Sequence, residues 1–280
     1  MGAKFIDGKA LGSRVRDDVR DRITQARREV RLDAVLVGAD QAARIYAQNQ
    51  AKTCKEVGID YHIHELPSTA GYEEIAGRIL LMNTDEGIRA LMLHLPLPAG
   101  VNTERVQSLI DPQKDVEGVN PANIGNIVYG RRSLVPCTAL AVLEMIEHTG
   151  IALRGARCVV VGASNIVGKP IAVLLMREEA TVISANKYTR ELPALAREAD
   201  VIVAAAGVPG LVTREWIKPG AVVIDVGINR VKGSDGAMRT VGDVDAAVAD
   251  VAGWVSPVPG GVGPMTVAML MRNVAQAALA

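Results

Sequence analysis

Short apolar runs rich in β-branched residues alternate with segments of helical periodicity along most of the chain. Because parallel strands can be joined only by a long crossover, usually a helix, this alternation predicts a mainly parallel α/β fold. Aromatic residues make up only 3% of the 280 residues, and aliphatic cores of this kind are common in parallel sheets. In the first half, the expected strands are 33–38, 60–67 and 90–98, and the expected helices are 10–31, 42–57, 72–81 and 102–110.

A second alternating unit follows a segment rich in Pro, Gly and Asn at 112–126, which we interpret as a loop and a domain boundary. Thr138 is a candidate N-cap for a helix at 135–150. The other elements expected here are strands at 157–163, 180–185, 200–206 and 220–227 and a last helix at 264–280. A chain of this length suits two domains. We expect residues 1–136 with 265–280 to form one domain and residues 137–264 to form the other.

The charge balance and the cysteines argue against several classes of protein. The formal net charge is +0, which gives no electrostatic basis for binding nucleic acid or an acidic membrane. No apolar run approaches the roughly 18 residues that span a bilayer, and the first residues lack the apolar core of a signal peptide. The three cysteines, Cys54, Cys137 and Cys158, have no metal-ligand spacing. We therefore expect a cytoplasmic protein without a metal centre and without a nucleic-acid or membrane partner.

The stretch "CVVVGASNIVGKPIAVLL" (158–175) predicts a hydrophobic strand, a glycine-bearing turn and a helix. Gly162 allows the turn, Gly168 permits close helix packing, and backbone N–H groups at a helix start suit a pyrophosphate. The spacing is not G-x-G-x-x-G, so an ordinary tight turn is an alternative. Small residues at 204–210 and 225–229 would let a flat cofactor approach the backbone. The expected cofactor-binding residues are Gly162, Ala163, Ser164, Ile166, Val167, Gly168, Ala206, Gly207, Val226, Gly227 and Ile228.

The end of the following strand indicates which dinucleotide binds. An NAD enzyme places Asp or Glu there to bind the ribose hydroxyl, but "SANKYTR" (184–190) offers Lys187 and Arg190 and no acid. Two cations suit a 2′-phosphate, so we favour NADP, with NAD as a possible substitute. A solvated basic loop is the alternative interpretation.

The segment "IYAQNQAK" (45–52) places Tyr46 and Gln50 four residues apart, on one face of the expected helix. Lys52 is about 240° around the helix from Tyr46, at roughly 100° per residue, and points elsewhere. A tyrosine beside a long polar side chain is plausible in an active site. A glutamine amide cannot titrate, so the segment leaves open whether Gln50 is a surface residue or replaces a catalytic group.

The loop "PVPGGVGPMT" (257–266) leads directly into a helix and makes the interpretation specific. Together with "GASNIVGKP" (162–170), "DVGIN" (225–229), "KDVEG" (114–118) and "LPLP" (95–98), it resembles the bifunctional methylenetetrahydrofolate dehydrogenase/methenyltetrahydrofolate cyclohydrolase family. The resemblance covers nearly the whole chain. It implies an α/β folate-binding domain and a Rossmann-like NAD(P)-binding domain with a cleft between them, and a homodimer paired through the cofactor domains.

The resemblance also implies a function and a set of site residues. Members of the family use NAD(P)⁺ to take a hydride from 5,10-methylenetetrahydrofolate, and many then hydrolyse the methenyl product. Four positions align with the reaction centre of the family: Tyr46, Gln50, His94 and Asp115. The substrate-binding positions implied are Tyr46, Gln50, His94, Leu95, Pro96, Glu117, Pro259, Gly260, Gly261, Pro264 and Thr266, and Gly261 would also contact the cofactor.

This sequence departs from the family pattern at three of these positions. Gln50 replaces the lysine of a Y-x-x-x-K motif, His94 replaces the glutamine of "QLPLP", and Glu117 replaces the second aspartate of K-D-V-D-G, while Tyr46 and Asp115 match. Similar enzymes assign the lysine to the proton chemistry of hydrolysis, the glutamine to its support, and the second aspartate to the pterin ring. Three roles have therefore changed in the predicted folate pocket.

These changes should weaken hydrolysis far more than oxidation. Adding water to a methenyl cation requires a titrating group, whereas hydride removal creates a cation and needs no general base. We therefore expect an NADP-dependent methylenetetrahydrofolate dehydrogenase with little or no cyclohydrolase activity. Three interpretations of His94 remain: it is a histidine packed in the core, it lines the pocket but transfers no proton, or it carries the proton in place of the lysine. The alternatives are a hydrolase of methenyltetrahydrofolate or a related adduct that uses His94, a dehydrogenase or reductase for another imine-like substrate, and a non-catalytic folate-binding subunit.

Overall fold

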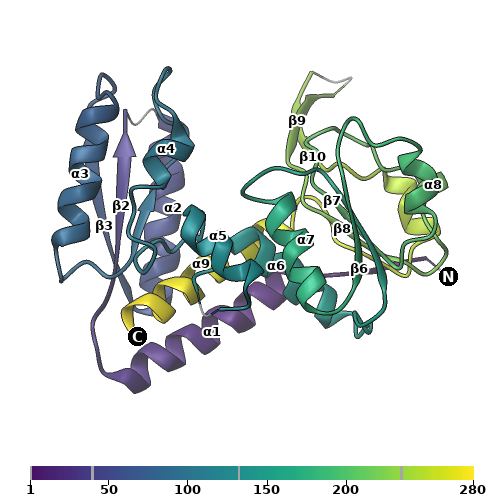
Figure 1. The fold of residues 1–280 in the computed structure, drawn as a ribbon, viewed down its shortest axis with the longest axis horizontal. Coiled ribbons are helices and arrows are strands. Elements are labelled where there is room, and N and C mark those ends of the chain that lie inside the picture. Colours follow the sequence, from purple (N-terminus) through teal and green to yellow (C-terminus); the bar gives the residue numbers. More distant parts are fainter. Residues whose placement is uncertain (1, 39–40, 132, 234–235) are drawn as a thin grey trace. The chain divides into compact units, whose positions relative to one another are not determined.

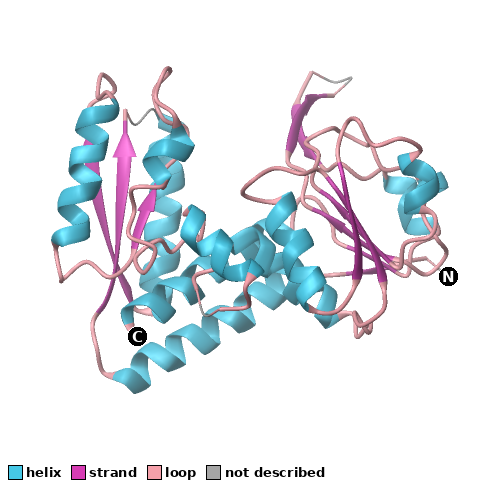
Figure 2. Cartoon of the chain, viewed as in Figure 1, coloured by secondary structure: helices cyan, strands magenta, loops and turns pink. Residues whose placement is uncertain are grey.

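A computed structural model of the chain describes residues 2–38, 41–131, 133–233 and 236–280. It divides into two compact units, Met1–Gly12 with Thr138–Thr266 and Ser13–Cys137 with Val267–Ala280. Each unit contains a parallel sheet and helices (Figures 1 and 2), so the predicted two-domain α/β fold is confirmed. We refer to them by their main sheets, as the six-stranded unit and the three-stranded unit.

Residues 1–12 differ from the division expected from sequence. Strand β1 (Lys4–Phe5) pairs in parallel with β11 (Trp254–Val255). The backbone N–H of Ile6 continues this pairing by donating to the carbonyl of Val255 over 2.9 Å. The first residues therefore complete the six-stranded unit, whereas the sequence alone assigned them to the domain formed by residues 1–136.

The three-stranded unit is a parallel sheet in the order β3–β2–β4. Every position of the central strand β2 except Arg31 is buried, as expected for a parallel strand covered on both faces. The strands are β2 (Val30–Val37), β3 (Ile59–Leu66) and β4 (Leu91–Leu93). The helices are α2 (Gln41–Val57), α3 (Tyr72–Thr84), α4 (Thr103–Gln107), α5 (Pro121–Val128) and the larger parts of α1 (Gly8–Ala26) and α9 (Val262–Ala278).

One face of this sheet carries an apolar core. Val35 pairs with Leu93 on the neighbouring strand, and both pack with Ile75, Ile79 and Val106. Ile75 and Ile79 are one helical turn apart on α3, so their side chains lie on the same side of the helix. This burial fixes α3 and α4 against the sheet.

The opposite face of the sheet carries a second set of side chains. The strand register sets Leu32 beside Tyr61 and Ala34 beside Met92. Because side chains alternate along a strand, Tyr61, Ala34 and Met92 lie on the face opposite the apolar core. Gln50 of α2 reaches Met92 on this face, so α2 covers it.

The six-stranded unit has the parallel order β1–β11–β8–β7–β5–β6. Its main strands are β5 (Arg157–Val161), β6 (Thr181–Ala185), β7 (Val201–Ala204) and β8 (Val222–Asp225). Its helical elements are α6 (Cys137–His148), α7 (Gly168–Arg177), α8 (Leu192–Ala196), η1 (Arg214–Trp216) and η2 (Ala246–Asp250). Since β5 lies between β6 and β7, the crossovers diverge at β5 and create a switch point where ligands bind in open α/β sheets.

Several elements differ from the sequence-based expectation. The antiparallel hairpin of β9 (Asn229–Lys232) and β10 (Met238–Val241) was not predicted. The segment at 112–126 is not a continuous loop, because α5 begins at Pro121 with the Asn120 side chain accepting a hydrogen bond from the N–H of Ala122. Helix α6 starts at Cys137, so Thr138 lies within its first turn instead of capping it.

Strand β4 is also shorter than the sequence predicts. The expected strand at 90–98 is regular only over Leu91–Leu93, since Pro96 and Pro98 lack the N–H that a ladder needs. The following His94 still donates its backbone N–H to the carbonyl of Val35 over 2.9 Å.

In the described part of the chain, no helix combines the length and the apolar character that a bilayer crossing requires.

Candidate active site

Helix α2 presents Tyr46 and Gln50 on one side, as the four-residue spacing predicts. Tyr46 is 59% exposed, whereas Gln50 is only 6% exposed. The Gln50 amide nitrogen donates to the sulfur of Met92 over 2.9 Å. Its carbonyl oxygen is buried without a hydrogen-bond partner among the described residues, so it can accept a hydrogen bond from a ligand or a water molecule. Lys52 is exposed and does not replace the missing lysine.

His94 lies directly after β4 and is 5% exposed. Its ring nitrogen Nε2 is 2.6 Å from the hydroxyl of Tyr61. The rings of Tyr46 and His94 meet edge to face, with centroids 6.0 Å apart. Burial lowers the pKa of His94 below its ordinary value, so the imidazole is neutral at neutral pH.

Glu117 brings a carboxylate to the same region. It accepts a hydrogen bond from the backbone N–H of Leu93, next to His94, over 3.3 Å. Burial raises the pKa of Glu117 to about 7, against the stabilising effect of that hydrogen bond. Burial is the main cause that raises the pKa values of Tyr46 and Tyr61, and the negative charge of Glu117 adds to both shifts. The Glu117 carboxylate is therefore close enough to interact electrostatically with both tyrosines.

Asp115 has a different environment from Glu117. Its fully buried carboxylate accepts hydrogen bonds from the backbone N–H of Asn120 at 2.7 Å and from the side chain of Asn123 at 3.0 Å. Burial raises its pKa, and these hydrogen bonds oppose the shift. Asp115 therefore shapes the loop that carries Glu117, although its second oxygen, Oδ1, has no partner among the described residues.

The structure thus brings Tyr46, Gln50, His94 and Glu117 together on one face of the three-stranded sheet. Leu95, partly exposed, and Pro96 follow His94 directly. Sequence reasoning missed Tyr61. The alternation at 60–67 predicted its strand and the side of that strand on which it lies, but the contact with His94 depends on the strand order.

The other predicted substrate positions lie in the six-stranded unit or in the helix that begins there. Gly260 has a φ of 111°, which favours glycine. The N–H of Gly261 donates to the carbonyl of Pro257 over 2.8 Å and closes the turn after Pro259. Helix α9 begins at Val262, so Pro264 and Thr266 lie in its first turns, and the Thr266 hydroxyl donates to the carbonyl of Val262 over 3.1 Å.

The expected nucleotide residues occupy the switch point of the six-stranded sheet. Gly162 follows β5 with a φ of 115°, and a Cβ on it would overlap the carbonyl of Ala205 after β7. Gly168 begins α7, and a Cβ on it would overlap the carbonyl of Gly162. The strand end, the turn and the helix start are therefore packed so closely that only glycine fits. This is the backbone cradle that a dinucleotide pyrophosphate requires at a helix N-terminus.

Two buried aspartates hold the neighbouring strand ends in place. One oxygen of Asp243 accepts hydrogen bonds from the N–H groups of Ala206 and Gly207, at 2.7 and 2.8 Å. Asp225 accepts from the N–H of Gly227 at 3.0 Å and of Asp243 at 2.9 Å. Burial, together with the charge of Asp243, raises the pKa of Asp225 to about 6. A Cβ on Gly227 would overlap the carboxylate of Asp243, so this strand end requires glycine, whereas Gly207 has open space but a φ of 68°. Val226 and the exposed Ile228 flank Gly227.

The basic turn after β6 is organised by Asn186. Its side chain accepts from the N–H of Tyr188 over 2.9 Å, and its carbonyl accepts from the N–H of Thr189 over 2.9 Å. Lys187 and Arg190 are both exposed, and the Lys187 ammonium lies 5.0 Å from the centre of the Tyr188 ring. Two exposed cations at the end of the strand beside β5 fit a 2′-phosphate.

Gly168→Ala should disrupt this cradle. The new methyl group would collide with backbone, which cannot rotate away, so we expect a loss of about 2–3 kcal/mol of unfolding free energy and loss of dinucleotide binding. Denaturant unfolding and cofactor titration would measure both. Gly77→Ala is the matched control, because nothing lies within 4 Å of that Cβ position on α3. It should stabilise by about 0.5–1 kcal/mol. Equal stability of Gly168→Ala and wild type would contradict the cradle.

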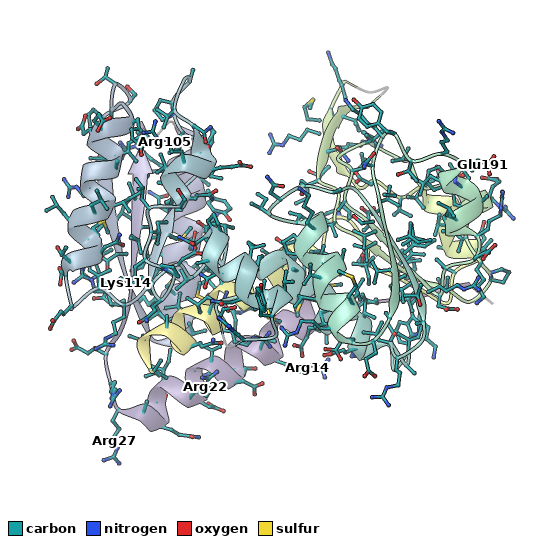
Figure 3. The ribbon with its side chains drawn as sticks, in the orientation of Figure 1. Arg14, Arg22, Arg27, Arg105, Lys114 and Glu191 are labelled. Atoms are coloured by element: carbon teal, nitrogen blue, oxygen red, sulfur yellow. The ribbon has the colours of Figure 1, made fainter. Side chains whose placement is uncertain are left out.

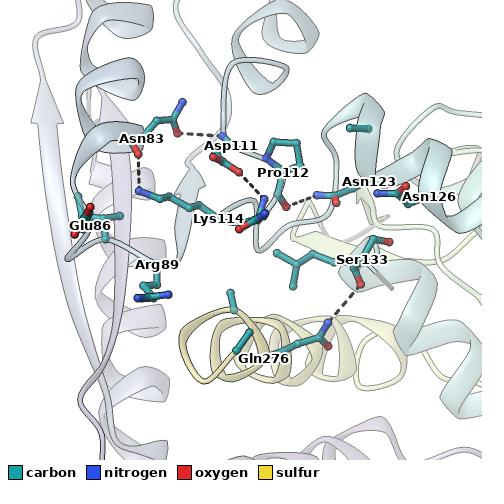
Figure 4. Close-up of a pocket in the computed structure, with 16 residues that line it drawn as sticks. Asn83, Glu86, Arg89, Asp111, Pro112, Lys114, Asn123, Asn126, Ser133 and Gln276 are labelled. Atoms are coloured by element: carbon teal, nitrogen blue, oxygen red, sulfur yellow. Dashed lines mark hydrogen bonds between the residues drawn. The ribbon is translucent and has the colours of Figure 1, made fainter. Parts of the chain in front are cut away.

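The loop before Asp115 is anchored by Lys114, labelled in Figure 3. Its ammonium donates to the carbonyls of Met82, Asn83 and Asp85 at 3.2, 2.7 and 2.8 Å, so it caps the C-terminus of α3. Lys114 also lines a pocket of about 990 Å³ formed by α3, the 111–114 loop, α5 and the end of α9 (Figure 4). Its described lining includes none of the residues expected to bind folate. No cluster of three metal-ligating side chains occurs among the described residues.

Two family models match this chain. Residues 6–117 match the model described as tetrahydrofolate dehydrogenase/cyclohydrolase, catalytic domain. Residues 136–280 match the model described as tetrahydrofolate dehydrogenase/cyclohydrolase, NAD(P)-binding domain. A relative from Moorella thermoacetica, named bifunctional protein FolD, is 44% identical over 282 residues, covering 99% of each chain.

Solved structures agree with these matches. The bifunctional enzyme FolD, methylenetetrahydrofolate dehydrogenase/cyclohydrolase, from Campylobacter jejuni superposes with a TM-score of 0.93 at 34% identity, covering 99% of this chain and 98% of that one. The FolD of Trypanosoma brucei, in complex with NADP cofactor and an inhibitor, gives a TM-score of 0.90 at 34% identity, covering 98% and 96%.

Proposed function

Because this chain belongs to the tetrahydrofolate dehydrogenase/cyclohydrolase family, we propose that it oxidises 5,10-methylenetetrahydrofolate with NADP⁺ and hydrolyses the product only weakly. In the oxidation, the bridging carbon loses a hydride and becomes the methenyl cation, and the nicotinamide of the bound cofactor is the hydride acceptor. The observation that carries this proposal is the glycine cradle of Gly162 and Gly168 at the switch point. A protein that only bound folate would not need such a cradle.

The folate side of the reaction requires alignment more than acid–base chemistry. The Tyr46 ring is accessible for stacking against the pterin, and the Glu117 carboxylate can accept its N–H groups. Leu95, Pro96 and the turn of Pro259, Gly260 and Gly261 supply further contacts that the family resemblance implies. Domain roles follow from this division: the three-stranded unit binds folate and the six-stranded unit binds NADP.

The protein has no titrating side chain for hydrolysis at position 50, where the family has lysine. Gln50 offers an amide that neither gains nor loses a proton near neutral pH. His94 is neutral, and its Nε2 is already engaged by Tyr61 at 2.6 Å, which disfavours a His94-based hydrolase. We infer that the methenyl product accumulates before it is hydrolysed.

The dehydrogenase proposal can be tested directly. Purified protein is mixed with NADP⁺ and 5,10-methylenetetrahydrofolate, and NADPH is followed by its absorbance. We expect steady turnover that depends on both substrates. Tight NADP⁺ binding without any turnover would contradict the proposal and indicate another imine-like substrate.

Tyr46→Ala should weaken folate binding by roughly 1 kcal/mol or more, because stacking against the pterin is lost.

The cofactor preference should depend on Lys187 and Arg190. Removing either cation from a 2′-phosphate costs about 1.5–3 kcal/mol, so Lys187→Ala should raise the KM for NADP⁺ about tenfold or more. The KM for NAD⁺ should stay nearly unchanged, because NAD⁺ has no 2′-phosphate. Arg197→Ala, an exposed arginine at the end of α8, is the control for Arg190→Ala. A clear preference of the wild type for NAD⁺ would refute this assignment.

We further propose a homodimer paired through the six-stranded units, in a reducing cytoplasmic setting. The three cysteines are free and buried, which suits reducing conditions. Sedimentation equilibrium at enzyme concentrations used for the assay would test the dimer, and a monomer would contradict it.

A further inference from the structure

The imidazole of His94 is held by three separate elements. Its backbone N–H donates to Val35 of β2, its Nε2 is 2.6 Å from the hydroxyl of Tyr61 on β3, and the ring of Tyr46 on α2 meets it edge to face. The Tyr61 and His94 rings are nearly perpendicular, at 85°. The small Ala34 lies between their strands on the same face, which leaves room for the two side chains to meet.

The chemistry of this contact determines where the protons lie. Burial lowers the pKa of His94. Burial also raises the pKa of Tyr61, and the charge of Glu117 adds to this rise. Both groups are therefore neutral near pH 7, and one hydrogen lies between them. A phenol is a stronger donor than a neutral imidazole, and an imidazole nitrogen is a stronger acceptor than a phenol oxygen. The Tyr61 hydroxyl therefore donates to Nε2, and the ring hydrogen of His94 is on Nδ1.

We propose that Tyr61 is a positioning residue that holds His94 in its Nδ1–H tautomer, so that His94 offers the reduced folate a hydrogen-bond donor and not a base. The role toward folate rests on the proposed function, whereas the tautomer does not. With Nε2 accepting from Tyr61 and Nδ1 carrying a hydrogen, neither ring nitrogen has a free lone pair for activating water.

The tautomer can be measured in the ligand-free protein. The ¹⁵N chemical shifts of the imidazole nitrogens, recorded from pH 7 to 9 on ¹⁵N-histidine protein and assigned with His94→Gln, distinguish protonated from unprotonated nitrogens. We expect an unprotonated Nε2 and a protonated Nδ1 throughout. In Tyr61→Phe the other tautomer should become populated, and His94 should take up a proton at higher pH than in the wild type. Tyr72→Phe, where the hydroxyl is lost from a ring stacked on Arg105, should leave the signals unchanged.

Kinetics provide a second readout. Losing an ordinary hydrogen bond costs about 0.5–1.5 kcal/mol, so Tyr61→Phe should raise the KM for methylenetetrahydrofolate about two- to tenfold and leave kcat nearly unchanged. In a His94→Ala background the same change should have no effect, because no hydrogen-bonding side chain then remains at position 94. A wild-type protein with hydrogen on Nε2, or a Tyr61→Phe variant with unchanged tautomer and KM, would overturn the proposal. Absence of dehydrogenase activity would refute the proposed function instead, since the tautomer is observed without substrate.

Discussion

Gln50→Lys is expected to increase hydrolysis of methenyltetrahydrofolate about 100-fold or more, because a positioned acid–base group contributes roughly 10²–10⁴-fold. Position 50 is almost fully buried, and burial lowers the pKa of a lysine toward neutrality. A lysine there could accept a proton from the attacking water, which the amide cannot. The decay of methenyl absorbance, corrected for the reaction without enzyme, measures the gain.

The matched control is Gln50→Met, which keeps the length of the side chain but cannot titrate. It should not increase hydrolysis. The double change of Gln50→Lys with His94→Gln should exceed the single change, and the two effects should not add, because Gln50 contacts Met92, two residues from His94. Robust hydrolysis by the unmodified protein that disappears in His94→Ala would show instead that His94 carries the proton.

Glu117→Gln should change stability and folate binding in opposite directions. Folding raises the pKa of Glu117 from 4.5 to about 7, so the folded protein binds this proton more tightly than the unfolded chain does. Stability is therefore lost as pH rises from about 4.5 to 7. The difference corresponds to at most about 3 kcal/mol, so the neutral amide should stabilise the protein by up to that amount at pH 8 and hardly at pH 5.

The same variant should bind folate poorly. A carboxylate that accepts pterin N–H groups contributes about 1.5–3 kcal/mol per charged hydrogen bond, so the KM for methylenetetrahydrofolate should rise about ten- to hundredfold. In the wild type this KM should fall as pH rises through about 7, as Glu117 ionises. Denaturant unfolding at pH 5 and 8 and steady-state kinetics test the two effects. Glu86→Gln, at an exposed position, is the control and should change neither. An unchanged KM would place Glu117 outside the folate site.

Much of the parallel framework could be predicted from sequence because the buried strands contain apolar runs. The runs at 33–38, 157–163 and 220–227 correspond to β2, β5 and β8. The hairpin of β9 and β10 has mostly exposed side chains and no apolar signal. Helix α5 was missed although Asn120 followed by Pro121 is a helix start signal, because Gly and Asn dominate the surrounding sequence.

The site was predictable where one local segment carries it and unpredictable where strands must first pair. The turn from Gly162 to Gly168 is local, and the spacing of Tyr46 and Gln50 is a property of one helix. The contact of Tyr61 with His94 joins the two outer strands of the sheet across β2. The roles of Asp225 and Asp243 likewise depend on loops from β7, β8 and β10 meeting, which no short motif reveals.

The most direct test of this account measures NADPH and methenyltetrahydrofolate at the same time. The protein is mixed with NADP⁺ and 5,10-methylenetetrahydrofolate, and both products are resolved by their absorbance spectra. The account predicts close to one methenyl cation for each NADPH early in the reaction, with decay of the methenyl signal much slower than its formation. Formation of NADPH without accumulation of methenyltetrahydrofolate would show that hydrolysis is intact and that the absence of a lysine at position 50 has not weakened it.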